Sequence, residues 1–150
     1  MILMILILLG CKNGIGSKPD SDTKTTDKVT PKLSIAEKLG ANNHLKIEDR
    51  IALYNKLKKE APNAYNFGNE DEMTMYGYRH LWNGQLTDAL EIFKLIVAEF
   101  PDSSNPYDSL GEAYLKNGQK DLARQQFEQV LVLEPEHEHA QKMLAELAGS

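Results

Sequence analysis

The hydrophobic residues divide the chain into three parts. Residues 1–9 are all apolar, residues 12–32 contain only Ile15 and Val29 as aliphatic residues, and the rest of the chain carries apolar residues at helical spacing. The polar segment cannot bury enough apolar surface to order itself, so residues 11–32 are predicted to be a flexible tether. The third part is predicted to be an all-α domain.

Helical periodicity marks both ends of this domain. It predicts a helix at 47–60 that ends before Pro62 and an amphipathic helix at 137–149. A short helix near 33–39, stopped by Gly40, is also predicted. The apolar residues that carry the two longer helices are Ile47, Ile51, Tyr54 and Leu57 in the first and Ala140, Met143, Leu144 and Leu147 in the last.

Between these helices the sequence repeats itself. One set of residue types recurs 34 positions later, which is a period typical of stacked helical repeats. Its small residues allow two helices to approach, its phenylalanines fill the space between units, its second glycines suit a left-handed helix end, and its prolines end helices. The matched sets are Tyr76, Gly77, His80, Gly84, Ala89, Phe93 and Pro101, and Leu110, Gly111, Tyr114, Gly118, Ala123, Phe127 and Pro135.

This pattern resembles the tetratricopeptide repeat (TPR), a helix–turn–helix unit. The second repeat matches closely, with Tyr107 at the family's tryptophan position, whereas the first is looser, with Met73 there and His80 at the tyrosine position. The resemblance implies a short α-solenoid of two TPR helix hairpins flanked by an N-terminal helix and a C-terminal capping helix. Expected helices are 70–83, 86–99, 104–117 and 120–133, with Ser103 or Ser104 capping the third. Expected boundaries are 33–69 for a helical extension, 70–103 and 104–137 for the repeats, and 138–150 for the cap.

The first eleven residues resemble a different family signature. Leu8-Leu9-Gly10-Cys11 is similar to the signal box of bacterial lipoproteins, although no basic residue precedes the apolar run. The resemblance implies that residues 1–10 are a signal peptide and that Cys11 becomes a lipid-modified N-terminus. It also implies a lipid-anchored protein of the bacterial envelope, and Lys12 and Asn13 favour the outer membrane.

Composition and charge exclude several classes of function. The net charge is −5, and residues 70–150 contribute 6 Lys+Arg against 15 Asp+Glu, which argues against nucleic-acid binding. No catalytic constellation is evident, and no cofactor is expected. His137 and His139 begin a helix without evident further ligands, so no metal site is predicted. His80 is predicted to pack in the core with a hydrogen bond.

The TPR resemblance implies a groove lined by the first helix of each unit. Acidic residues replace the basic ones that clamp carboxylates in chaperone-binding relatives, so a basic or amphipathic protein segment is the expected partner. Two positions remain open for Trp82: it either faces the groove or packs against the helix at 47–60. The groove candidates are Asp71, Thr74, Tyr78, Leu81 and Trp82 in the first repeat and Asn105, Asp108, Glu112, Leu115 and Lys116 in the second.

These observations predict a membrane-anchored, non-catalytic adaptor that binds a peptide or helix in the TPR groove. An alternative follows from residues 100–118, which resemble short repeat tails at the C-terminus of bacterial secreted hydrolases. The chain would then be a detached regulatory or docking tail of a serine-hydrolase-like enzyme. A third hypothesis is a small-ligand binder that uses Tyr78 and Trp82 as an aromatic platform.

Overall fold

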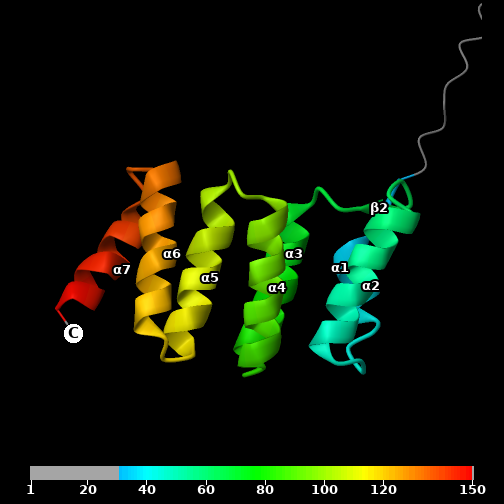
Figure 1. The fold of residues 1–150 in the computed structure, drawn as a ribbon, viewed down its shortest axis with the longest axis horizontal. Coiled ribbons are helices and arrows are strands. Elements are labelled where there is room, and N and C mark those ends of the chain that lie inside the picture. The colour runs from blue at the N-terminus through cyan, green and yellow to red at the C-terminus, as the bar shows by residue number, and fades with distance from the viewer. Residues whose placement is uncertain (1–30, 150) are drawn as a thin grey trace, which may run out of the picture. The chain divides into compact units, whose positions relative to one another are not determined.

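The computed structural model describes residues 31–149, and the signal-peptide, lipid-anchor and tether predictions for residues 1–30 lie outside that range. The described part is an all-α solenoid whose helices stand side by side in chain order (Figure 1). None of its helices has both the length and the apolar character that crossing a membrane requires. The helices are α1 (Ile35–Gly40), α2 (Ile47–Glu60), α3 (Glu70–Trp82), α4 (Leu86–Glu99), α5 (Ser104–Lys116), α6 (Lys120–Leu133) and α7 (Glu138–Ala148).

The two predicted hairpins, α3–α4 and α5–α6, are confirmed. Each turns at a glycine in the left-handed region, Gly84 at φ 76° and Gly118 at φ 75°. The amide that follows each glycine donates to a carbonyl five residues back, from Gln85 to His80 and from Gln119 to Tyr114, both at 2.9 Å. This pattern satisfies the end of the first helix and starts the second.

A second glycine brings the two helices of each hairpin together. A Cβ atom built on Gly77 would lie 2.6 Å from Phe93 Cε1, and one on Gly111 would lie 2.7 Å from Phe127 Cε1. Both phenylalanines are fully buried. The predicted close approach is therefore confirmed, because each ring occupies the space where a larger residue would place its side chain.

The start of α5 differs from the prediction. Ser103 is the N-cap residue, but its side chain makes no capping hydrogen bond, and the Ser104 hydroxyl donates instead to Glu134 Oε2 at 2.7 Å. Pro106 in the first turn has no N–H, so this helix start has one donor fewer to satisfy. Ser103 thus takes the predicted cap position, but the third helical residue, Pro106, has no N–H to donate to its side chain.

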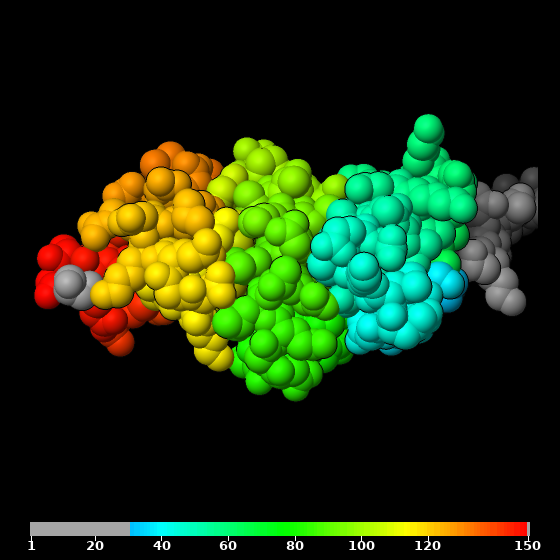
Figure 2. All heavy atoms as spheres, turned by 60° about the horizontal axis from the view of Figure 1, so that its bottom comes forward, coloured from blue at the N-terminus to red at the C-terminus, as the bar shows by residue number. Residues whose placement is uncertain are grey.

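Helices at both ends cover the repeats, as predicted. α1 packs on α3 and α2 on α4, whereas α7 packs on α6. The extension also contains an unpredicted pairing, in which the short strands β1 (Leu33–Ser34) and β2 (Tyr65–Asn66) lie parallel. In the space-filling view the helices form neighbouring strips of surface from cyan α2 to red α7 (Figure 2).

Candidate functional site

The most exposed aromatic side chain of the described residues lies on the first repeat. Trp82 ends α3 with 63% of its surface exposed, and its ring stacks on Tyr78 at a centroid distance of 5.5 Å and an interplanar angle of 26°. Tyr78 also meets the buried Phe93 edge-on at 5.1 Å. Of the two places left open for Trp82, the structure therefore supports the groove, and Tyr78 supplies a fixed surface beneath it.

A cavity of about 260 Å³ opens beside this pair, between α3 and α5. Leu81 is buried and Leu115 is half-buried, so apolar side chains line the cavity together with the charged Glu112 and Lys116. Four of the predicted partner-binding residues come together here with these two leucines. The lining residues are Tyr78, Leu81, Trp82, Glu112, Leu115 and Lys116.

Tyr78 connects the two repeats. Its hydroxyl donates to Glu112 Oε2 on α5 at 2.7 Å. Burial raises the pKa of the Tyr78 phenol, and the hydrogen-bonded carboxylate of Glu112 raises it further. The phenol therefore stays a hydrogen-bond donor at physiological pH and holds this side of the cavity in one arrangement.

Asp108 of α5 also holds the capping helix. Nδ1 of His139 on α7 lies 2.8 Å from Asp108 Oδ1, and its Nε2 lies 3.6 Å from Glu112 Oε1. An ionised carboxylate can only accept, so His139 carries a proton on Nδ1 and donates it to Asp108. Two acidic residues predicted to meet a partner are thus engaged within the chain, and they bring α3, α5 and α7 to one face.

The other predicted groove residues lie away from the cavity. Asn105 donates to Glu70 Oε1 at 2.8 Å, and Asp71 is exposed. Thr74 is only 8% exposed, and its hydroxyl is buried. The structure therefore corrects the prediction for Thr74, whose side chain is buried and not presented to a partner.

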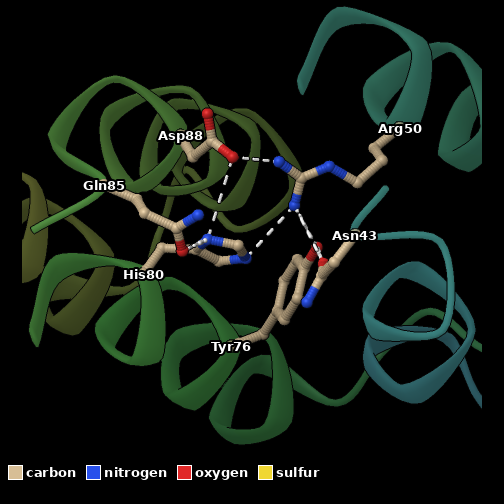
Figure 3. Close-up of polar contacts among 6 residues, drawn as sticks. All are labelled: Asn43, Arg50, Tyr76, His80, Gln85 and Asp88. Atoms are coloured by element: carbon tan, nitrogen blue, oxygen red, sulfur yellow. Dashed lines mark hydrogen bonds and ion pairs between the residues drawn. The ribbon is translucent and has the colours of Figure 1, made fainter. Parts of the chain in front are cut away.

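A second polar cluster is buried where the extension meets the first repeat (Figure 3). Arg50 of α2 is 2% exposed and reaches toward α3 and α4. Its Nη1 donates to the Tyr76 hydroxyl at 2.6 Å and to His80 Nε2 at 3.1 Å, and its Nη2 pairs with Asp88. Asn43 accepts from both Arg50 and Tyr76.

His80 occupies the centre of this cluster. It is buried, as predicted, and its Nδ1 lies 2.8 Å from Gln85 Oε1. Because Arg50 donates to Nε2, that nitrogen is the acceptor and Nδ1 carries the proton. Burial lowers the pKa of His80, and the neighbouring Arg50 charge acts in the same direction. Through the neutral imidazole and the buried arginine, this cluster, the buried lock, joins α2 to α3 and α4.

Sequence reasoning missed Arg50 and the position of His139, although each left a signal. Arg50 falls on the apolar stripe of α2, between Ile47 and Tyr54, where a charge is unexpected unless it is paired. His139 lies 34 residues after Asn105, which in turn lies 34 after Asp71. Extending the groove register into the cap would have placed His139 on the same face.

Comparison with known proteins agrees with this geometry. The tetratricopeptide repeat family model matches residues 81–147, from the last turn of α3 through most of α7. No curated protein matches the chain. The match covers both helices of the second repeat together with the cap, and proteins built from such repeats generally bind other proteins.

Proposed function

We propose that this repeat protein is a non-catalytic interaction module that binds a protein segment at the face formed by α3 and α5. One observation carries the proposal: the largely exposed Trp82, stacked on Tyr78, stands beside an open cavity to which Leu81 and Leu115 contribute apolar surface. Rigid aromatic residues beside such a cavity are typical anchors of protein interfaces, where a few residues supply most of the binding energy.

The cavity favours an amphipathic segment as partner. About 260 Å³ is below the usual range for drug-sized ligands, roughly 300–1,000 Å³, but it accommodates an apolar side chain of a peptide or helix. Residues 70–150 carry a net charge of −9, so basic residues flanking the anchor would speed association. Asp108 is hydrogen-bonded to His139, and Glu112 to Tyr78. The contact of an apolar partner residue with Trp82 and the cavity is therefore the main source of affinity.

We infer further that the module acts at a membrane of the bacterial envelope, with the outer membrane favoured. The support is the lipoprotein-like Leu8-Leu9-Gly10-Cys11 leader followed by a polar tether of about twenty residues. A lipid on Cys11 would hold the domain near partners on the same surface and raise their effective concentration.

The binding proposal is tested by selecting peptides from a random phage-displayed library on the wild-type chain. Enriched peptides are expected to share an apolar residue flanked by Lys or Arg. Their binding should be lost with Trp82→Ala and retained with Val132→Ala, because Val132 is also largely exposed but lies on α6, outside the cavity. Enrichment of the same peptides on Trp82→Ala, or no enrichment at all, would refute the proposal.

Radiolabelled palmitate tests the anchor separately. Cells that express the wild-type chain should incorporate label, whereas a Cys11→Ser chain should not. Equal labelling of both chains would contradict lipid attachment at Cys11 and would leave the binding proposal untouched.

A further inference from the structure

Two side chains from different helices face one another across the edge of the groove. Nε2 of His139 on α7 and Oε1 of Glu112 on α5 lie 3.6 Å apart. Together with Asp108, they form a group of three potential metal-ligand side chains whose ligand atoms all lie within 4.8 Å of one another. Imidazole nitrogen and carboxylate oxygen are both common ligands of zinc.

The hydrogen bonds assign different roles to the three side chains. Asp108 accepts the Nδ1 proton of His139, which leaves the lone pair of Nε2 directed away from Asp108. Zinc-bound histidines usually donate their second ring N–H to a carboxylate in this way, which fixes the tautomer and the orientation of the ring. Asp108 is therefore the positioning residue, and His139 Nε2 is the ligand atom.

Glu112 is prepared in a similar manner. Its Oε2 accepts from Tyr78 at 2.7 Å, and its Oε1 remains on the side of His139. Zinc–nitrogen and zinc–oxygen bonds of about 2.1 Å at a tetrahedral angle would separate the two ligand atoms by about 3.4 Å. The observed 3.6 Å is close to that value. Each ligand thus has a hydrogen-bonded partner and the spacing that a shared ion needs.

We propose that His139 and Glu112 bind a divalent transition-metal ion such as Zn²⁺, with Asp108 and Tyr78 as positioning residues. The ion joins α7 to α5 and leaves coordination positions open to water or to a carboxylate or imidazole of a bound molecule. Both ligand side chains are half-buried, so the ion can enter without opening the fold. This site does not depend on the binding of a protein segment proposed above.

Zinc titration by calorimetry tests the site. The probe is Zn²⁺ added to the full chain in mild detergent, without a histidine tag and with Cys11→Ser, because a thiolate is itself a strong zinc ligand. One ion per chain is expected. Absence of saturable binding would overturn the proposal.

Three substitutions assign the ligands. His139→Asn keeps an N–H near Asp108 but removes the ligand nitrogen, so binding should be lost while circular dichroism stays unchanged. Asp108→Ala should weaken binding about 10- to 100-fold, as observed for partners of metal-bound histidines, and Asp108→Asn should weaken it less because its amide oxygen still accepts the Nδ1 proton. Zinc binding that survives His139→Asn would refute the assignment.

His137 provides the matched control. Its Nδ1 accepts from the Ala140 amide at 3.3 Å, and its ring lies 6.5 Å from that of His139. His137→Gln should bind zinc as the wild type does, and loss of binding would show that the two histidines, not the proposed pair, hold the ion. Cu²⁺ gives a second measurement, because a bound paramagnetic ion should quench Trp82, which lines the same cavity as Glu112. His139→Asn should abolish this quenching.

Discussion

Replacing Gly111 by alanine tests whether packing within the second repeat depends on a missing side chain. The new Cβ would lie 2.7 Å from Cε1 and 2.8 Å from Cζ of Phe127, which is fully buried and cannot move into solvent. Overpacking of a well-packed core costs roughly 1–3 kcal/mol, and this contact belongs near the upper end because two ring atoms are involved. Alanine recovers about 1 kcal/mol through its higher helix propensity, so we expect a net loss of about 2 kcal/mol.

A double-mutant cycle separates this contact from other effects of the substitution. In a Phe127→Leu background the obstructing ring is absent, so Gly111→Ala should be neutral or stabilise the protein by up to about 1 kcal/mol. Gly118→Ala is the control. Its φ of 75° and the empty space around it predict a strain of about 1–2 kcal/mol that Phe127→Leu does not relieve.

Urea unfolding followed by far-ultraviolet circular dichroism measures these free energies. The reasoning fails if Gly111→Ala costs the same in both backgrounds, because the loss would then have another origin. It also fails if Gly111→Ala stabilises the wild-type background. Gly111 precedes Glu112, so a displaced α5 should also weaken binding at the groove.

Further predictions concern the buried lock and the exposed tryptophan. Arg50→Met should lower the free energy of unfolding by about 3 kcal/mol, the lower end for breaking a buried ion pair. The loss stays at that end because Asp88 is 24% exposed and can be hydrated. A loss below about 1 kcal/mol in urea unfolding would contradict the role of Arg50 in joining the helices. The lowered pKa of His80 means that the unfolded chain takes up the proton first, so the free energy of unfolding should fall as pH drops below 6.5, and His80→Gln should flatten that dependence. Acrylamide should quench Trp82 readily in the free chain and less when a selected peptide is bound; quenching typical of a buried indole would refute its exposure.

The helices were predictable because their signals are local. The glycines at 84 and 118 and the 34-residue period placed the repeat helices within a residue of their observed ends. The pairing of β1 with β2 left no such signal, since Leu33 and Tyr65 lie far apart in the chain and each strand has only two residues. A periodic pattern cannot report a contact of that kind.

The candidate site was predictable only in part. The repeat register correctly grouped Tyr78 and Trp82 with Glu112 and Lys116 around one cavity. It failed for Thr74, because a groove position in the register does not guarantee exposure where neighbouring helices pack closely. It also left the Asp108 carboxylate available to a partner, because the histidine 31 residues away is brought to it only by the docking of α7.

The same hydrogen bonds that complete the fold also arrange the proposed binding face. Tyr78 of α3 holds Glu112 of α5, and His139 of α7 lies between Glu112 and Asp108. The two repeats and the capping helix are therefore fixed relative to one another before any partner arrives, which lowers the ordering cost of binding. Reversing the charge of Asp108 or Glu112 would disturb the cap as well as the groove. Trp82 takes no part in these hydrogen bonds, so replacing it should remove the proposed binding without loosening the solenoid.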